Sequence, residues 1–329
     1  MDVIGWGVMG AARIAEIAVI PALQRARNAR VVAIASRTLP RAQDAARRMG
    51  IAKAYGSYEA LLDDPEVQAV YIPLPNALHR EWTLRSASAG KHVLCEKPLA
   101  VSAEDCEAMI AACRRQGVTL MEAFMYRFHP RTERALEIAA SGAIGEVRLV
   151  RAEFTFAART PHGNIRFDPA LGGGALFDVG CYAVNLCRAV LGEPREAMAF
   201  ASTGSTGVDE VTGGLLRFDD RRLAVLDCAL TLPRRQEYEI VGTDGTLRVP
   251  APDAFLPGTA DAELYVTRTG ESQVIRFSGT DQYQRMVEHF GDALAGRPLA
   301  LPPEDAVGNL RVLAALHASI RRGAPVSIA

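Results

Sequence analysis

The first 120 residues alternate between short apolar runs rich in β-branched residues and longer amphipathic stretches, and this alternation restricts the fold more than any other feature. Such a pattern is typical of βαβ units around a parallel sheet. We expect strands at 4–9, 31–35, 53–55, 69–72, 92–94 and 118–121, and helices at 13–27, 41–49, 78–88 and 103–115. The sequence therefore predicts a first, α/β domain over residues 1–122.

From about Gly145 apolar and polar residues alternate, which favours antiparallel strands. Segments of this kind cover 147–156, 197–202, 213–218, 223–232, 237–241, 264–267 and 274–277. Asp219-Asp220 predicts a turn, and Asp244-Gly245 predicts a hairpin turn that needs a positive φ. Amphipathic helices over 282–294 and 304–320 could pack on either domain. The second domain, 123–329, is predicted to be α+β and built on a large, mostly antiparallel sheet.

The charge balance excludes several classes of partner. Lys and Arg number 37 against 38 Asp and Glu, a net charge of −1 with no run of like charges, so we expect a small-molecule substrate and neither nucleic acid nor membrane. Six cysteines without a CxxC pair favour reduced thiols and a cytoplasmic protein. Because no stretch of about 18 apolar residues occurs and no two histidines have metal-ligand spacing, we expect neither a membrane span nor a metal site.

A glycine-rich segment follows the first predicted strand. Gly5, Gly7 and Gly10 match G-x-G-x-x-G literally, but only four residues precede Gly5, too few for the strand that feeds a phosphate-binding turn. We place the strand at 4–9 and the turn at Gly10-Ala11-Ala12-Arg13-Ile14-Ala15. The free N–H groups of the following helix can then hold phosphate. A strand–helix turn without a ligand is the alternative.

Ser36 and Arg37 follow the second strand, where a dinucleotide fold meets the adenine ribose. An acidic residue there would favour NAD, whereas a hydroxyl and a guanidinium suit the 2′-phosphate of NADP. We predict NADP, with NAD as the other option. A solvated loop arginine is the competing interpretation of Arg37.

Motifs spread over nearly the whole chain resemble the Gfo/Idh/MocA oxidoreductase family: Gly10–Ala15, Pro73–His79, Glu96-Lys97-Pro98, Tyr126–Pro130 and the Gly172–Tyr182 segment. Tyr182 after the glycines, with residues 122–124 and 151–154, resembles the branch of trans-dihydrodiol dehydrogenases and NADP-dependent D-xylose 1-dehydrogenases. Ala12 departs from the glycine of many relatives and should slightly restrict the approach of pyrophosphate. The resemblance implies a Rossmann first domain, with these further residues on the cofactor side: Pro73, Asn76, His79, Glu96 and Lys97.

Hydride transfer at a carbinol carbon needs a group that exchanges a proton with the substrate oxygen. A free phenol titrates near about 10, and a neighbouring ammonium favours the phenolate, so Lys97 and Tyr182 are the candidates. On a helix over 175–191, Asp178, Tyr182 and Asn185 stand at i, i+4 and i+7 and share a face. The resemblance places that face opposite Lys97, where Asp178 would bind a substrate hydroxyl or orient Lys97. A surface lysine, a core tyrosine and a first-turn acid are the alternatives.

Arg127, Asn164, Arg166 and Asn185 are candidate substrate contacts, although for Asn164 and Arg166 a solvated loop is an equal alternative. We predict an NADP-dependent oxidoreductase of a sugar, cyclic polyol or dihydrodiol that forms a homodimer or higher homo-oligomer. Rival enzymes are a keto-sugar nucleotide reductase and a sugar oxidoreductase with tightly held cofactor. The rival from another class is an NADP-binding regulator without turnover.

Overall fold

A computed structural model describes residues 3–158 and 163–328 of the chain. Contacts divide it into two compact units. The first unit contains Met1–Met125 and Asp281–Val307, and the second contains Tyr126–Thr280 and Gly308–Ala329. The chain therefore passes between the units three times.

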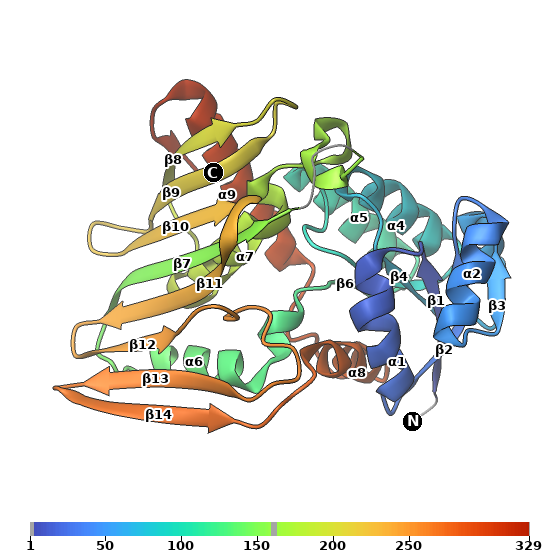
Figure 1. Cartoon of the computed structure of the whole chain (residues 1–329), viewed down its shortest axis with the longest axis horizontal. Helices are drawn as coiled ribbons and strands as arrows, with labels where there is room; N and C mark the ends of the chain where they lie inside the picture. The colour runs from blue at the N-terminus through green and yellow to red at the C-terminus, as the bar shows by residue number, and fades with distance from the viewer. Residues whose placement is uncertain (1–2, 159–162, 329) are drawn as a thin grey trace. The chain divides into compact units, whose positions relative to one another are not determined.

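In the described part of the first unit, six parallel strands form one sheet in the order β3-β2-β1-β4-β5-β6 (Figure 1). The strands are β1 (Ile4–Met9), β2 (Ala29–Ala35), β3 (Lys53–Tyr55), β4 (Ala69–Ile72), β5 (His92–Cys95) and β6 (Leu120–Glu122). Every strand expected here from the sequence is found, and the predicted parallel α/β sheet is confirmed. The strand order reverses between β1 and β4, and such a point opens a crevice at the carboxyl ends of the strands.

Gly5 belongs to β1, as the placement of the strand predicted. A Cβ atom on Gly5 would lie 2.0 Å from the carbonyl oxygen of Glu66, so this glycine allows the segment before β4 to pack closely against β1. Gly5 and Gly7 of the literal G-x-G-x-x-G match therefore lie within β1, where close packing favours glycine, and not in a phosphate-binding turn.

The helices of the first unit follow its strands. The stretch predicted as one helix over 13–27 contains a π-helical segment, η1 (Ala15–Val19), before α1 (Ile20–Arg25). The others are α2 (Leu39–Met49), α3 (Tyr58–Leu62), η2 (Asn76–Leu78), α4 (His79–Ser88), α5 (Ala103–Arg115) and α8 (Gln282–Leu294).

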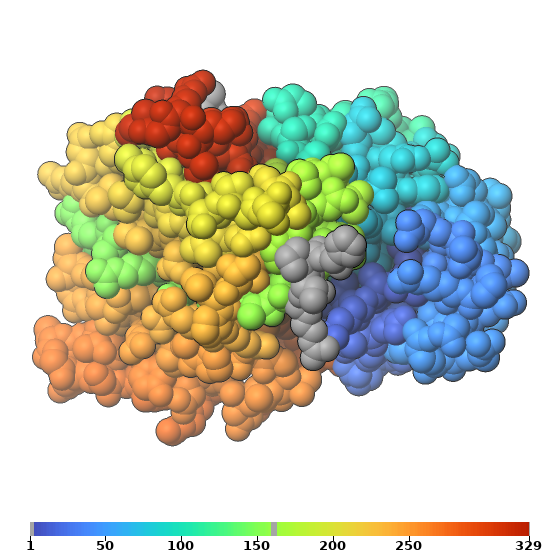
Figure 2. All heavy atoms as spheres, turned by 45° about the horizontal axis from the view of Figure 1, so that its top comes forward, coloured from blue at the N-terminus to red at the C-terminus, as the bar shows by residue number. Residues whose placement is uncertain are grey.

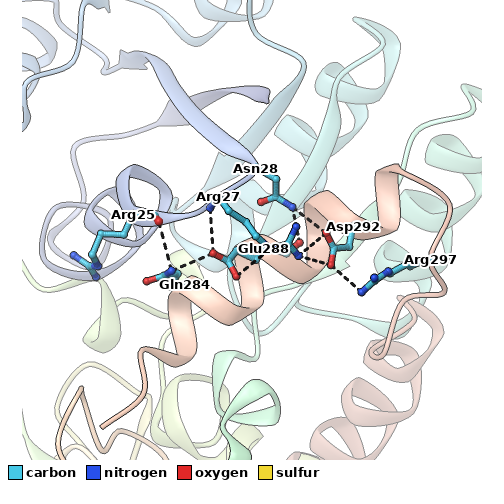
Figure 3. A network of polar contacts seen from close by, with 7 residues as sticks. All are labelled: Arg25, Arg27, Asn28, Gln284, Glu288, Asp292 and Arg297. Carbon is cyan, nitrogen blue, oxygen red and sulfur yellow. Dashed lines mark hydrogen bonds and ion pairs between the residues drawn. The ribbon is translucent and has the colours of Figure 1, made fainter. Parts of the chain in front are cut away.

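Helix α8 is more than 150 residues away in sequence from the strands of the first unit, but it packs within this unit through a polar network (Figure 3). Arg27 donates to both oxygens of Asp292 at 2.7 and 2.6 Å, and Asn28 donates to the carbonyl oxygen of Glu288 at 2.9 Å. An aromatic contact adds to the network, since the ring centroids of Trp6 on β1 and Phe290 on α8 lie 5.2 Å apart. The sequence left open which domain this helix packs on, and the network shows that it packs on the first unit.

The second unit contains, among the residues described, a nine-stranded sheet in the order β14-β13-β12-β11-β7-β10-β9-β8-β15. Its strands are β7 (Val147–Ala157), β8 (Glu196–Thr203), β9 (Asp209–Arg217), β10 (Leu223–Ala229), β11 (Thr231–Gly242), β12 (Gly245–Val249), β13 (Ala262–Arg268), β14 (Glu271–Phe277) and β15 (Val326–Ser327). Strands β7 and β10 pair in parallel and the other neighbours are antiparallel, which confirms a mostly antiparallel sheet.

Two expectations for this sheet were wrong. The run 223–232 is not one strand, because the chain crosses the end of β7 at Leu230 and continues as β11 on the other side. Apolar residues continue through the crossing, so the sequence pattern did not show it. The predicted hairpin is present, with Val241 opposite Thr246, but Gly245 does not adopt the positive φ expected of it. A Cβ there would lie 2.3 Å from the carbonyl oxygen of Thr267, so close approach by β13 requires the glycine.

The large sheet packs against helices α6 (Pro130–Ala140), η6 (Leu176–Gly180), α7 (Cys181–Leu191) and α9 (Glu304–Arg322). The short helical segments are η3 (Met125–Phe128), η4 (Ile165–Phe167) and η5 (Pro169–Leu171). Figure 2 shows the red end of α9 beside the yellow strands β8 and β9, where Ser319 accepts from the Ala199 N–H at 3.0 Å. The helical stretch Pro169–Leu191 is long and apolar enough to cross a membrane, but 78% of its apolar window is buried inside the protein, as in a core helix.

Candidate active site

The turn after β1 has the geometry of a phosphate-binding loop. Gly10 adopts φ +119°, a conformation that favours glycine, and its N–H donates to the carbonyl oxygen of Ala35 at 2.8 Å. The helix begins at Arg13, directly after Ala11 and Ala12. Its first N–H groups, Ile14 included, therefore lie at the carboxyl edge of the sheet, next to the point between β1 and β4 where the strand order reverses.

Two arginines follow β2, and the sequence analysis identified one of them. Ser36 is buried and its N–H donates to the carbonyl oxygen of Tyr55 at 3.1 Å, whereas Arg37 is exposed. Arg41, in the first turn of α2, donates to the carbonyl oxygen of Ala11 at 3.2 Å. Burial raises the pKa of the nearby Tyr58 hydroxyl, and the charges of Arg37 and Arg41 act to lower it. Arg37 and Arg41 are four residues apart, and this spacing could have identified Arg41 from the sequence as a second candidate phosphate contact.

His79 joins two loops at the carboxyl edge. Its imidazole is fully buried, with Nε2 2.8 Å from the carbonyl oxygen of Leu74 and Nδ1 2.9 Å from that of Pro98. Burial is the main cause of its lowered pKa. His79 thus connects the loop after β4, which contains Pro73 and Asn76, to the loop after β5.

Glu96 fixes the backbone that carries Lys97. The Tyr71 hydroxyl donates to Glu96 Oε1 at 2.6 Å, and the Lys97 N–H donates to Glu96 Oε2 at 3.2 Å. Burial, followed by the adjacent Glu96 charge, raises the pKa of Tyr71 well above its ordinary value, so this phenol remains a donor. In the same loop the Leu99 N–H donates to the buried Glu122 carboxylate at 2.7 Å. Lys97 therefore leaves the sheet from a firmly held segment, and its side chain is partly buried.

The residues proposed for the cofactor side thus follow the carboxyl ends of β1, β2, β4 and β5, which are neighbours in the sheet. Parallel strands bring these ends to one edge, so the structure gathers them as a group.

In the second unit Tyr182 lies among aromatic rings. Its ring centroid is 5.8 Å from that of Tyr126, 5.2 Å from Phe154 and 5.6 Å from Phe255. The side chain is buried, with 4% of the residue exposed. Phe255 comes from the segment between β12 and β13, and no sequence signal linked it to Tyr182.

Asn185 lies one turn further along α7 and is fully buried. Its Oδ1 accepts from the Tyr126 hydroxyl at 2.6 Å and from the Arg127 guanidinium at 3.1 Å. Tyr182 and Asn185 therefore both approach Tyr126, which agrees with a shared helix face.

Asp178 stands on the π-helical segment η6, which precedes the regular α-helix, so the i, i+4 geometry expected between Asp178 and Tyr182 does not apply strictly. The Asp178 carboxylate accepts from Arg166 Nε at 2.6 Å, and the Arg166 guanidinium lies 5.6 Å from the Phe156 ring centre. Asn164 accepts from the Arg166 N–H at 3.2 Å and so closes a local turn. Two of the predicted substrate contacts, Asn164 and Arg166, thus contact residues of their own unit.

Within residues 3–158 and 163–328, no group of three or more His, Cys, Asp or Glu side chains is placed so that it could hold a metal ion. All six cysteines fall within these ranges, are buried and form no disulfide there.

A parallel sheet with strand order 3-2-1-4-5-6, a glycine turn at the first helix and a lysine at the carboxyl edge define a dinucleotide-dependent oxidoreductase architecture. The second unit adds a helix bearing a buried tyrosine and an ion-paired aspartate. Residues 4–124 match the oxidoreductase family with the NAD-binding Rossmann fold, GFO/IDH/MocA, and residues 132–248 match its C-terminal domain. The chain belongs to the GFO/IDH/MocA oxidoreductase family.

Several relatives are similar over most of their length. D-xylose 1-dehydrogenase (NADP(+)) 2 of Haloferax volcanii is 44% identical over 328 residues, covering 98% of this chain and 99% of the relative. Trans-1,2-dihydrobenzene-1,2-diol dehydrogenase of Danio rerio is 39% identical and covers 75% and 74% of the two chains. A 3-ketoreductase from Actinomadura kijaniata, solved with NADP and TDP-benzene, has a TM-score of 0.90 at 32% identity and covers 97% of this chain and 98% of its own.

Proposed function

We propose that this protein is an NADP-dependent dehydrogenase that oxidises a hydroxyl carbon of a sugar or related polyol. The observation that carries the proposal is the 44% identity, over 98% of the chain, with an NADP-dependent D-xylose 1-dehydrogenase. The dihydrodiol dehydrogenase relatives support a neighbouring substrate class, a cyclic vicinal diol.

The residues of the first unit fit a dinucleotide. Gly10 permits the tight turn, and the N–H groups from Ala11 to Ile14 would hold the pyrophosphate. Ser36, Arg37 and Arg41 would hold the 2′-phosphate, which explains a preference for NADP over NAD. Pro73, Asn76, Glu96 and Lys97 would line the nicotinamide side, and the buried His79 would hold their loops together.

When bound, the nicotinamide cofactor supplies the hydride acceptor or donor. Tyr182 would exchange the proton with the substrate oxygen, and the Lys97 ammonium would stabilise the phenolate form. Asp178 would bind a neighbouring substrate hydroxyl while Arg166 holds its carboxylate. Arg127 would act on substrate through Asn185, which it already contacts.

A keto-sugar nucleotide reductase is the second candidate. It is favoured by the 35% identity, over 324 residues, with dTDP-3,4-didehydro-2,6-dideoxy-alpha-D-glucose 3-reductase of Actinomadura kijaniata. The two candidates differ in substrate and in the direction of hydride transfer.

A homodimer and a cytoplasmic location complete the proposal. One face of the large sheet exposes apolar side chains, with Phe200 65% exposed and Leu215 48%, alongside Leu223 and Val225. Cross-strand register places Leu215 opposite Val225, so they form one patch, which a second copy of the chain would cover. The six cysteines of the described residues are buried and form no disulfide, which agrees with a reducing compartment.

The test is a screen of NADP+ reduction with D-xylose, other aldoses, inositols and a trans-dihydrodiol, together with NADPH oxidation by a dTDP-keto-sugar. Turnover of D-xylose or another aldose with NADP+ is expected. Activity only toward the keto-sugar nucleotide would favour the second candidate, and NADP binding without any turnover would favour a regulator.

A further inference from the structure

Asp209, the first residue of β9, reaches the beginning of the helical segment that carries Asp178 and Tyr182. It is buried, with 8% of the residue exposed. Its Oδ2 accepts from the Leu176 N–H at 2.8 Å and from the Thr212 hydroxyl at 3.0 Å. Leu176 opens η6, so the carboxylate satisfies an N–H group that the helix itself leaves unpaired.

The same carboxylate determines which residue can precede the helix. Gly174 adopts φ +118°, and a Cβ on it would lie 2.3 Å from Asp209 Oδ1. The third glycine of the 172–174 run is therefore required both by its backbone conformation and by the oxygen that occupies the space beside it. Asp209 thus contacts both the turn at Gly174 and the helix start at Leu176, and it holds both of them against β9.

Helix α9 places His317 near Asp209. The His317 ring lies 5.1 Å from the ring of Phe177, which neighbours Leu176. Burial raises the pKa of Asp209 and lowers that of His317, while the charge of each acts to favour the ionised form of the other. The carboxylate is therefore enclosed between a strand and a helix and has little freedom to move.

We propose that Asp209 is a positioning residue for the hydride-transfer reaction, which holds the helix start so that Tyr182 keeps its reactive placement. This inference rests on the proposed function. It differs from a general role in stability because the contact is made within the turn that leads directly into the site helix, and a displacement of about 1 Å there is enough to lower turnover strongly.

The test compares Asp209→Ala and Asp209→Asn with Asp281→Ala. Asp281 is the matched control, since it caps α8 through the N–H groups of Tyr283 and Gln284 on a helix without candidate site residues. With D-xylose and NADP+, Asp209→Ala is expected to lower kcat at least tenfold, with KM within threefold and the Kd for NADP+ within twofold. Asp209→Asn keeps an oxygen acceptor and should recover kcat to within about fivefold of wild type. Asp281→Ala should reduce thermal stability and leave kcat unchanged.

A Tyr182→Phe background separates this inference from the proposed function. If Asp209 acts through Tyr182, adding Asp209→Ala to Tyr182→Phe should lower kcat by less than twofold more. Unchanged kcat in Asp209→Ala, or a loss that multiplies fully with that of Tyr182→Phe, would overturn the positioning role. Normal turnover in Tyr182→Phe alone would instead refute the proposed proton carrier.

Discussion

Arg166 and Asp178 form one charged unit, with the guanidinium Nε 2.6 Å from the carboxylate Oδ2. Asp178 is the more buried partner, its side chain 16% exposed against 41% for Arg166. A guanidinium that donates to a carboxylate in this way fixes the orientation of the carboxylate. The pair therefore unites two residues that the sequence suggested separately, one as a catalytic group and one as a substrate contact.

We expect Arg166→Met and Asp178→Asn to affect kcat/KM for a polyol substrate non-additively. Each single variant breaks the same ion pair, so the double variant should lose less than the product of the two single losses, by about 0.5–3 kcal/mol of coupling. Steady-state kinetics of the four proteins measure this coupling. Independent, multiplicative losses would show that Arg166 does not act through Asp178.

We expect the choice between NADP+ and NAD+ to depend on Arg37 and Arg41, the two arginines that follow β2. Arg37→Ala and Arg41→Ala should each weaken NADP+ binding about tenfold or more, equivalent to roughly 1.5–3 kcal/mol for a charge-assisted phosphate contact. The affinity for NAD+ should change little, because NAD+ lacks the 2′-phosphate. Titration with both cofactors tests this, with Arg47→Ala on the exposed far end of α2 as the control. Equal losses for NAD+ and NADP+ would refute it.

His79 should make the folded state less stable as pH falls below about 6.5. Its pKa in the folded protein is lowered from 6.5, mainly by burial, so in that range the unfolded chain binds a proton that the folded chain does not. Stability from this group is complete above pH 6.5 and declines below it, by up to about 1 kcal/mol between pH 7.5 and 6.0.

Urea unfolding of wild type and His79→Gln at the two pH values measures the difference. A smaller pH dependence in the variant is expected, and NMR titration of the wild-type imidazole gives a second measurement that does not require the variant to fold. A His79 signal that titrates at or above 6.5 would contradict the prediction.

Quaternary structure is tested by light scattering at micromolar concentration, where we expect about twice the chain mass. Phe200→Asp or Leu215→Glu, on the exposed sheet face, should give monomers. Ile17→Asp, at an exposed site on η1 of the first unit, should remain dimeric. A monomeric wild type would contradict the proposed interface.

Much of the fold could be predicted because its elements are encoded locally. The strands over 53–55 and 69–72 and the helix over 103–115 match β3, β4 and α5 residue for residue. Gly10 was identified because a tight turn between a strand and a helix has a local signature.

Other features depend on contacts between distant segments. The crossing at Leu230 leaves the apolar run unbroken, and the placement of α8 depends on Arg27 and Asp292, which are 265 residues apart. The sequence around Asp209 indicates only the start of a strand. Its proposed positioning role depends on its contacts with Gly174 and Leu176, which are more than 30 residues away in the sequence. The local pattern of a sequence carries no record of such partners.

In the proposed mechanism Tyr182 exchanges the proton with the substrate oxygen, and Lys97 stabilises the phenolate form of Tyr182. A phenol alone is a weak base at neutral pH, so activity that remains in Lys97→Met should rise with pH toward about 10 in the oxidation direction. Two residues that act as a unit should also give non-additive losses.

The most direct measurement is kcat for NADP+ reduction by wild type, Tyr182→Phe, Lys97→Met and the double variant, with the Kd for NADP+ measured alongside. Tyr182→Phe should lower kcat about a hundredfold or more with little change in NADP+ affinity, and the double variant should be hardly worse than either single one. Near-normal turnover in Tyr182→Phe, or full additivity of the two losses, would show that the proton travels by another route.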